Sequence, residues 1–400
     1  MAAGKGTRLG PLTKNRPKPL IPLAGKPVIE HIIRSLIKNN VDNIAIIVHY
    51  YMDKIKEYID KLDINVNVNY IYQEKLNGTG SAVLLAENFV GGEPFIAVYG
   101  DITLNDKVLA KVFKYFEKNP CDALITGVRV DDPSKYGVLI LEEDRLVKIV
   151  EKPKINVGSN LINAGIYIFT TKIFDACRRI VFSERGELEL TDAITLLNER
   201  GLVRVFNGGS GWWYDVGHPW DLLDANRYCL NQIDTSIVGK CFPNTIIYEP
   251  VHIGEEACIE SGVIIFGPSY IGRNVEIGYN SVIGPYASIG DNVRIGPLTY
   301  VSESIILDNT IISSHCAVVE SVIGEGCYIE SGVRIPSTNI YGENVKVLIK
   351  NILVDSGRKK LGALIGDNVT IGANTSIWPG TIIMPNKKIP PNSFINKPLI

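Results

Sequence analysis

The stretch from Ile271 to Tyr300 reads IGRNVE-IGYNSV-IGPYAS-IGDNVR-IGPLTY, and each of its hexads begins with Ile-Gly. Isoleucine recurs every six residues from Ile247 to Ile295, Val301 continues the series, and the period returns over 365–395. A six-residue repeat predicts a parallel β-helix. In such a coil each hexad forms one flat side, the isoleucine points inward, and the glycine or small residue turns the corner.

The repeat is interrupted in two places. Ile323, Ile329 and Ile335 form a shorter run that is out of phase with the first. We therefore expect residues 302–322 and 337–364 to be loops that leave the coil. Residues 227–245 follow neither pattern of the chain, so we expect the linker between its two halves there.

The first half alternates short apolar runs with amphipathic stretches. This alternation predicts an α/β layered domain over residues 1–232, followed by the β-helix over 233–400. A phosphate site in such a domain belongs at strand ends and helix N-termini. The expected strands are Ile44–Val48, Phe95–Val98, Ala123–Val128 and Ile162–Phe169, and the expected helices are Val28–Lys38, Ser81–Asn88, Lys107–Lys118 and Leu188–Glu199.

Composition limits the function. The 41 basic residues nearly balance the 43 acidic ones, so neither a nucleic acid nor an anionic membrane is expected as a partner. The chain has no apolar run of the ~20 residues that cross a bilayer. Its seven cysteines include no C-x-x-C pair, which points to a reducing, cytoplasmic setting.

The first twenty residues, MAAGKGTRLGPLTKNRPKPL, form a glycine-rich basic loop. Glycines allow backbone N–H groups to approach a phosphate closely, while Arg8 and Lys18 add cations for a triphosphate. Pro17 and Pro19 stiffen the backbone around Lys18. The alternative is a surface turn with solvated charges. The residues expected to line the phosphates with their backbone are Ala3, Gly4, Gly6 and Thr7.

Two further segments suit a nucleotide. Gln73 precedes Gly78 and Thr79, and an amide can both donate to and accept from a pyrimidine edge; an ordinary helix start capped by Thr79 is the alternative. Gly100 and Asp101 follow the apolar run 95–98, where a carboxylate can hold Mg²⁺ on a phosphate or simply form a turn.

Three short motifs suit a sugar phosphate. Gly137 allows close approach, Glu151 offers a carboxylate to sugar hydroxyls, Lys152 offers a cation to the phosphate, and Asn163 offers an amide. Each motif is weak alone, and a surface Glu-Lys pair is usually solvated. Their order and spacing along the chain make a chance origin improbable.

Residues 1–232 resemble sugar-1-phosphate nucleotidylyltransferases, whose signature is roughly G-x-G-x-R-(x)n-P-K-P. The resemblance implies a Rossmann-like nucleotidyltransferase domain, nucleobase contacts from the Gln73 segment, and Asp215 as a second Mg²⁺ ligand beside Asp101. It implies transfer from UTP or dTTP to glucose-1-phosphate or N-acetylglucosamine-1-phosphate, with release of pyrophosphate. Mannose-1-phosphate guanylyltransferases and catalytically silent regulatory or scaffold paralogues share this architecture and remain alternatives.

The whole chain resembles archaeal bifunctional enzymes that add a left-handed β-helix of hexapeptide repeats, and the motifs at 186–192 and 356–362 support this likeness. The resemblance implies a homotrimer or larger oligomer, and acetyl transfer from acetyl-CoA with His315 as general base. The related acetyltransferases carry His-x-x-Tyr, whereas Val318 stands in the fourth position here. A scaffold with a lone polar histidine is the alternative. Further residues expected at this site are Asn339, Lys346 and Lys359.

The resemblance also bears on the start of the chain. In the family an apolar central strand runs into the glycine loop, and Met1 occupies the position of its last residue. We therefore expect the natural chain to begin several residues upstream, which an intact mass of the native protein would check.

Overall fold

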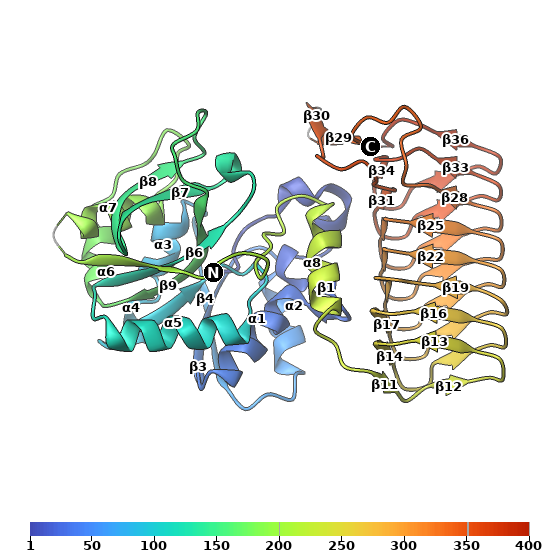
Figure 1. Cartoon of the computed structure of the whole chain (residues 1–400), viewed down its shortest axis with the longest axis horizontal. Coiled ribbons are helices and arrows are strands. Elements are labelled where there is room, and N and C mark those ends of the chain that lie inside the picture. The colour runs from blue at the N-terminus through green and yellow to red at the C-terminus, as the bar shows by residue number, and fades with distance from the viewer. Residues whose placement is uncertain (200, 350–351, 400) are drawn as a thin grey trace. The chain divides into compact units, whose positions relative to one another are not determined.

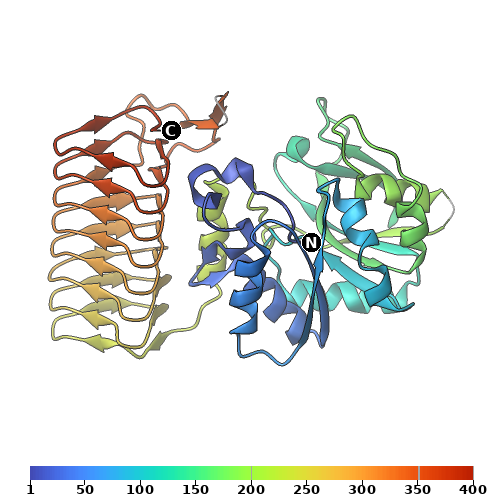
Figure 2. The same ribbon diagram turned by 180° about the vertical axis from the view of Figure 1, so that it is seen from behind.

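A computed structural model describes residues 1–199, 201–349 and 352–399 (Figures 1 and 2). Its contacts divide the chain into two compact units. The first unit comprises Met1–Gly4 and Val28–Trp213, and the second comprises Lys5–Pro27 and Tyr214–Ile400. The predicted domain boundary after residue 232 stays a prediction.

The first unit is built on a six-stranded mixed sheet, with a separate parallel strand pair. In the sheet β9 runs antiparallel to β5 and β6, and β10 runs parallel to β6. The sheet order is β5 (Phe95–Val98), β9 (Leu161–Phe169), β6 (Ala123–Arg129), β10 (Val203–Asn207), β8 (Arg145–Glu151) and β7 (Gly137–Glu142); the pair is β3 (Asn43–Val48) and β4 (Asn67–Tyr72).

Helices pack on both faces of this sheet. Alternate residues of β9 serve the two cores: Tyr167 and Phe169 pack with α3, α6 and α7, whereas Ile168 packs with α5. The helical segments are α1 (Val28–Lys38), α2 (Met52–Asp60), α3 (Thr79–Leu84), α4 (Glu87–Val90), α5 (Asp106–Lys118), η3 (Pro133–Lys135), α6 (Lys172–Cys177) and α7 (Leu190–Asn198).

The expected elements of the first unit are confirmed to within two residues, with one exception. The single helix expected over 81–88 is wrong, because two short helices, α3 and α4, occupy this region. The chain passes from one to the other at Leu85–Ala86, where Ala86 N bonds Val83 O at 3.0 Å in an i→i−3 turn.

Met1 and Ala2 lie between β5 and β3. The Met1 amino group donates to Val98 O at 2.9 Å, and Gly100 N donates to Met1 O at 2.8 Å. On the other side, Ala2 N donates to Ile47 O at 2.8 Å. These two residues therefore join the six-stranded sheet to the β3–β4 pair. The expected upstream start stays a prediction.

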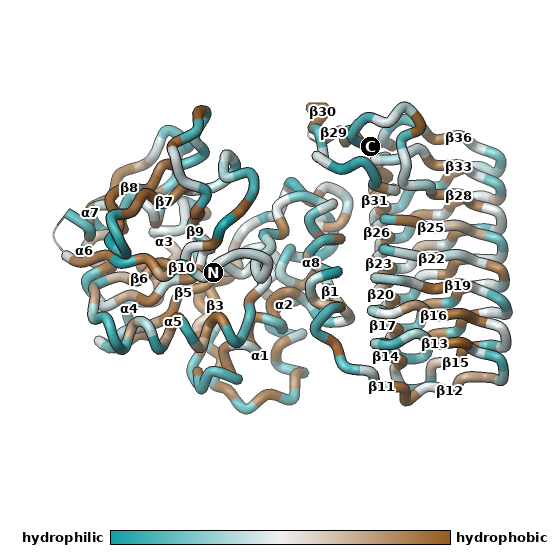
Figure 3. Tube along the Cα trace, in the orientation of Figure 1, coloured by the Kyte–Doolittle hydropathy of each residue, from teal (hydrophilic) through white to brown (hydrophobic). Residues whose placement is uncertain are grey.

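The second unit contains a β-helix with three eight-stranded parallel faces, so the predicted solenoid is confirmed; its left-handed sense stays a prediction. Figure 3 shows hydrophobic stretches along its strands and hydrophilic ones at its turns. The first face is β11 (Ser236–Ile237), β14 (Val251–Ile253), β17 (Ser269–Ile271), β20 (Ser288–Ile289), β23 (Ile305–Ile306), β26 (Val322–Ile323), β31 (Leu364–Ile365) and β34 (Ile382–Ile383). The second is β12 (Lys240–Cys241), β15 (Cys258–Ile259), β18 (Glu276–Ile277), β21 (Arg294–Ile295), β24 (Ile311–Ile312), β27 (Tyr328–Ile329), β32 (Thr370–Ile371) and β35 (Lys388–Ile389). The third is β13 (Ile246–Tyr248), β16 (Ile264–Phe266), β19 (Val282–Ile283), β22 (Tyr300–Ser302), β25 (Ala317–Val319), β28 (Arg334–Ile335), β33 (Ser376–Ile377) and β36 (Phe394–Ile395).

Residues at different positions of the six-residue repeat have different structural roles. Inward isoleucines such as Ile277 are fully buried, as predicted. The corner itself is turned by the third residue after the isoleucine, which adopts a left-handed backbone, as at Asn274 (φ 51°) and Asn280 (φ 57°). The glycine directly after the isoleucine is needed for a different reason than predicted. A Cβ on Gly272 would lie 2.8 Å from the carbonyl carbon of Gly290 in the next coil.

The expected loop at 302–322 is wrong, because the coil continues without a break. Eighteen residues separate Ile271 from Ile289, whereas 17 separate Ile289 from Ile306, and strand pairing is kept. The missing residue lies at the corner between the third and first faces, at 302–304 and again at 319–321. The out-of-phase isoleucines therefore reflect two shortened coils.

The expected loop at 337–364 is confirmed. Strand β28 ends at Ile335 and the coil resumes at β31, which pairs with β26 at Val322 and Leu364, so the described residues between Ile335 and Leu364 leave the coil at the same third-to-first corner. They carry the antiparallel hairpin β29 (Lys346–Ile349) and β30 (Ile352–Asp355).

The remaining segments of the second unit lie against the first face. Helix η1 (Thr7–Thr13) contacts β31 and β34. Asn226, on α8 (Asp221–Leu230), accepts hydrogen bonds from Ala24 N and Ser288 Oγ, each at 2.8 Å. The short elements η2 (Lys18–Leu20), β1 (Pro22–Leu23) and β2 (Lys26–Pro27) complete this layer. No helix in the described part of the chain is long and apolar enough to span a membrane.

Candidate active site

The glycine loop folds back onto Lys18. Gly6 takes a left-handed conformation (φ 62°), and a Cβ there would lie 3.0 Å from Lys18 Cβ. The Thr13 hydroxyl donates to Gly6 O at 3.0 Å and closes the loop. No protein atom lies within 4 Å of a Cβ built on Gly4, and the approach of both glycines to a phosphate stays a prediction.

Arg8, Lys18 and Asp215 come together in the second unit. Lys18 is 6% exposed, and its Nζ lies 3.7 Å from Asp215 Oδ1. A Cβ on Gly217 would lie 3.0 Å from Asp215 Oδ2, 3.2 Å from Asp221 Oδ2 and 3.7 Å from Arg8 Nη1. This arrangement places two cations beside a carboxylate, as phosphate chemistry with a divalent ion requires.

Asp221 is near this cluster but was not predicted from the sequence. Its Oδ2 accepts from His218 N at 2.6 Å, and it is the first residue of α8. An acidic residue at a helix start was the available signal, but it is common to many helices without a binding role.

The segment of the first unit that is predicted to bind the base is held by the distant motif 186–192. Gln73 is 4% exposed, and its Nε2 donates to Gly78 O at 3.2 Å. Gly78 has φ 120°, and a Cβ there would lie 2.4 Å from Leu188 O. The Thr79 hydroxyl accepts from Leu190 N at 3.0 Å, so Thr79 serves the start of α7 rather than that of its own helix. The structure brings Gln73, Gly78 and Thr79 into one loop.

Gly137 and Glu151 are paired across β7 and β8. A Cβ on Gly137 would lie 2.9 Å from Glu151 Oε1, so the glycine makes room for this carboxylate. Desolvation by the surrounding protein raises the pKa of Glu151, although the residue keeps solvent access. Lys152 follows with φ 43° and donates its N–H to Tyr136 O at 3.0 Å.

Asn163 lies at an irregularity of β9, and its side chain makes hydrogen bonds to other residues of the same strand. Its Nδ2 donates to the Tyr167 hydroxyl at 2.8 Å, and its Oδ1 accepts from Gly165 N at 3.0 Å. The amide is thus fixed in direction, which suits a group that must meet a ligand in one orientation.

Asp101 lies three residues after β5 and is half-buried. A Cβ on the preceding Gly100 would lie 2.7 Å from Met1 O, so this glycine is needed against the first residue of the chain. The described residues contain no group of three or more His, Cys, Asp or Glu side chains suited to a metal. Hard carboxylate oxygens nevertheless fit Mg²⁺, which takes few protein ligands and fills its octahedron with phosphate oxygens and water.

The residues expected for acetyl transfer are only partly gathered. Asn339 and Lys346 line a cavity of about 230 Å³ at the third-to-first corner, together with Trp378 and Thr381. Exposed His315 sits at the second-to-third corner, where its carbonyl accepts from Arg334.

Val318 and Lys359 argue against a close match to the related acetyltransferases. Val318, where they carry Tyr, is fully buried in the coil. Lys359 donates to Gly342 O at 2.7 Å and is not among the residues that line the cavity. Within one chain, His315 and Lys359 are therefore not part of the cavity that holds Asn339 and Lys346.

The first unit also has a larger cavity of about 1110 Å³. Its described lining includes Pro153, directly after Lys152, and the pair Arg129 and Asn160, which share a 2.7 Å hydrogen bond. The predicted site residues of this unit do not line it. This cavity is thus separate from the predicted site residues.

Comparison with known proteins defines the class. Residues 1–232 match the Nucleotidyl transferase family, and the chain belongs to it. Residues 265–358 match the GMPPB C-terminal domain, and residues 362–386 match the hexapeptide repeat of succinyl-transferase.

Similar curated proteins cover nearly the whole chain. The bifunctional protein GlmU of Methanocaldococcus jannaschii is 39% identical over 370 residues, 92% of this chain and 87% of its own. A bifunctional sugar-1-phosphate nucleotidylyltransferase/acetyltransferase of Sulfurisphaera tokodaii is 38% identical over 372 residues, 92% of this chain and 89% of its own.

Solved structures match the nucleotidyltransferase part. A protein assigned as a glucose-1-phosphate thymidylyltransferase, from Bacillus anthracis, has a TM-score of 0.54 at 30% identity over 59% of this chain and 95% of its own. A UDP-glucose pyrophosphorylase complexed with UDP-glucose has a TM-score of 0.53 at 26% identity, over 58% of this chain and 97% of its own.

Proposed function

We propose that the protein transfers a nucleotidyl group from a nucleoside triphosphate to a sugar 1-phosphate and releases pyrophosphate. The observation that carries this proposal is the cluster of Asp215 with Arg8 and Lys18, which lie on the loop that bears the family's glycine signature. The names of the bifunctional relatives and of the solved neighbours support the same reaction.

In this reaction a phosphate oxygen of the sugar 1-phosphate attacks the α-phosphorus in line, and pyrophosphate leaves. The nucleophile is already an anion, so no general base is needed, and catalysis consists of positioning and charge stabilisation. Arg8 and Lys18 neutralise the leaving pyrophosphate. Lys152 binds the sugar phosphate.

The remaining predicted residues orient the substrates. Glu151 and Asn163 meet the sugar hydroxyls, and Gln73 meets the nucleobase beside the Gly78–Thr79 turn. On the family resemblance, Asp101 and Asp215 hold Mg²⁺. When bound, this ion offsets negative charge on the phosphate oxygens.

For the substrates we propose UTP or dTTP with glucose-1-phosphate or N-acetylglucosamine-1-phosphate. The thymidylyltransferase and UDP-glucose names of the structural neighbours favour a pyrimidine nucleotide. The competing pair is GTP with mannose-1-phosphate. A silent paralogue is disfavoured because Arg8, Lys18 and Asp215 are all present and gathered.

Pyrophosphate release over a panel of triphosphates and sugar phosphates tests the proposal. We expect turnover with one pyrimidine pair, and its loss in Lys18→Ala and in Asp101→Ala without loss of the cooperative melting transition. Lys61→Ala, an exposed lysine paired with Glu57 on α2, is the matched control and should keep native turnover. Absence of turnover with every pair, or near-native turnover in folded Lys18→Ala, would contradict the proposal.

A second activity, acetyl transfer from acetyl-CoA to glucosamine-1-phosphate, is favoured by one observation. The cavity lined by Asn339 and Lys346 lies between the segment that leaves the coil and the corner that carries Trp378 and Thr381. We expect acetyl transfer by the wild type and its loss on His315→Ala. A wild-type protein that transfers no acetyl group would end this proposal.

The third face of the β-helix suits self-association into a homotrimer or a higher oligomer. Its outward column runs Ile246, Ile264, Val282 and Tyr300, and Ile246 and Tyr300 are 47% and 42% exposed. Light scattering coupled to gel filtration should give three or more chains, and a monomer would refute this. A cytoplasmic location stays a prediction.

A further inference from the structure

Two carboxylates of the β-helix form ion pairs with Arg16, which lies two residues before Lys18 in the glycine-rich loop. Asp367 and Glu325 lie at the first-to-second corner of neighbouring coils. Arg16 Nη2 lies 3.0 Å from Asp367 Oδ1 and 2.8 Å from Glu325 Oε2. Asn15 Nδ2 donates to Asp367 Oδ2 at 3.1 Å. The Arg16 side chain is 11% exposed and that of Asp367 is 5% exposed, so solvent screens this pair little.

The ion pairs that hold Arg16 also restrict the position of Lys18, because the backbone between the two residues is stiff. Only Pro17 separates the two residues, and Pro19 follows. Proline fixes its own φ and restricts the residue before it, so fixing Arg16 also limits where Lys18 can lie. Lys18 in turn packs on Gly6 and faces Asp215.

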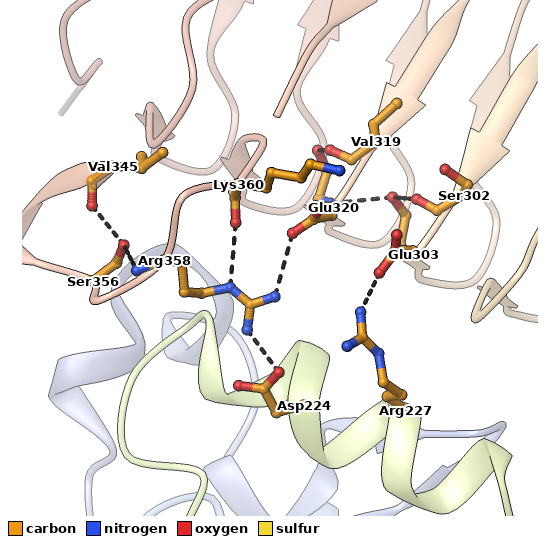
Figure 4. A network of polar contacts seen from close by, with 12 residues as sticks. Asp224, Arg227, Ser302, Glu303, Val319, Glu320, Val345, Ser356, Arg358 and Lys360 are labelled. Carbon is orange, nitrogen blue, oxygen red and sulfur yellow. Dashed lines mark hydrogen bonds and ion pairs between the residues drawn. The ribbon is translucent and has the colours of Figure 1, made fainter. Parts of the chain in front are cut away.

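A second set of ion pairs holds the helix that follows Asp215 (Figure 4). Arg358, from the segment that leaves the coil, donates to Asp224 Oδ1 at 2.7 Å and to Glu320 Oε2 at 3.3 Å. One turn along α8, Arg227 pairs with Glu303. The Arg358 side chain is 17% exposed and that of Glu320 is 6% exposed.

Glu303 and Glu320 occupy the two shortened third-to-first corners, where both have positive φ. These corners turn their carboxylates toward α8, as Figure 4 shows. Helix α8 begins at Asp221, six residues after Asp215. Both sides of the Lys18–Asp215 pair are therefore tied to the same face of the β-helix.

We infer that the β-helix positions the Lys18–Asp215 pair for nucleotidyl transfer, with Arg16, Asp367 and Arg358 as positioning residues. The inference rests on the proposed function. It gives the β-helix a task in the first reaction whether or not it transfers acetyl groups. The reason is geometric, since displacement of a charged group by about 1 Å can lower the rate by up to about 100-fold.

The first test removes the charge of Asp367 with Asp367→Asn. The matched control is Asp291→Asn, because Asp291 stands at the same corner of a lower coil and also accepts a backbone N–H, from Arg273 at 2.8 Å. We expect kcat/KM for pyrophosphate release to fall by about 10-fold to 100-fold in Asp367→Asn and to stay native in Asp291→Asn. Equal losses in the two variants would overturn the inference.

The second test separates coupling from damage. Arg16→Gln and the double variant Arg16→Gln/Asp367→Asn should lose activity by the same factor, because either change breaks the same contact. Arg16→Lys should recover part of the loss. Losses that multiply in the double variant would overturn the inference. If Asp367→Asn does not fold, Arg16→Gln carries the test, because Arg16 lies outside the coils.

The third test uses Arg358→Gln. Its control is Arg294→Gln, which removes an exposed arginine that is paired with Glu276 on the β-helix. We expect a 10-fold or larger loss of kcat/KM only in Arg358→Gln. Native turnover in Arg358→Gln would overturn the assignment of Arg358.

A readout without turnover separates this inference from the proposed function. Hydrogen exchange of residues 5–20 should quicken in Asp367→Asn and Arg16→Gln and stay native in Asp291→Asn. If the wild type shows no turnover with any substrate pair, the proposed function fails. The exchange result still shows whether Arg16 and Asp367 hold residues 5–20 in place. If the wild type turns over and exchange does not change, the inference alone fails.

Discussion

Alanine at Gly6 is expected to disable the active site with only a modest loss of stability. The backbone there has φ 62°, which costs an L-residue about 1–2 kcal/mol. The added Cβ would lie 3.0 Å from Lys18 Cβ and 3.3 Å from Thr13 Cγ2, so one of these neighbours must shift by a few tenths of an ångström. The strain alone lowers the melting temperature by about 2–8 °C.

The loss of activity should be larger than this strain suggests. Lys18 is confined by Gly6 on one side and by Asp215 on the other, so it has little room to move without changing its distance to the phosphates. We expect kcat/KM for pyrophosphate release to fall by about 10-fold to 100-fold.

A second glycine of the loop distinguishes backbone strain from collision with Lys18. Gly10 has φ 56° but no atom within 4 Å of an added Cβ, so Gly10→Ala should be destabilised with a much smaller loss of turnover. A Gly6→Ala variant as active as the wild type, or a Gly10→Ala variant as inactive as Gly6→Ala, would refute this reasoning.

Three further outcomes are expected. Gly137→Ala would place a Cβ 2.9 Å from Glu151 Oε1 and displace that carboxylate, so initial-rate kinetics should show a KM for the sugar phosphate raised by about 10-fold and an unchanged KM for the triphosphate. Burial raises the pKa of Glu320, so the stability contributed by its protonated form is lost as pH rises through the raised pKa; the melting temperature of Glu320→Gln relative to the wild type should therefore be higher at pH 7.5 than at pH 4, and the same difference at both pH values would refute this. Removal of divalent ions with a chelator should stop pyrophosphate release, and added Mg²⁺ should restore it; release that persists in the chelator would refute the Mg²⁺ assignment.

The period of the repeat was enough to predict the solenoid, because one isoleucine per side must point inward in every coil. It was misleading at 302–322, where a shift of phase has two physical causes that look alike in sequence. A loop can leave the coil, or a corner can lose one residue while the strands stay paired. Val301 to Ile306 is the second case.

The predicted site residues were found from motifs, but their neighbours were not. Arg16 looked like one more charge in a basic loop, and its partner Asp367 lies 351 residues further along the chain. Arg358 belonged to a recognised motif whose role the pattern did not reveal. Contacts of this kind depend on tertiary structure and leave no periodic trace in the sequence.

From Ile253 onward, all variation in coil length falls at one edge of the β-helix. Six residues separate the inward positions at the other two corners there, whereas the third-to-first corner is shortened at 302–304 and 319–321 and extended between Ile335 and Leu364. This part of the β-helix thus has two edges with a fixed count and one edge that tolerates insertion and deletion. New segments can be grafted at that edge without disturbing the stacked strands, so it is the natural place for evolution or an engineer to change what the coil carries.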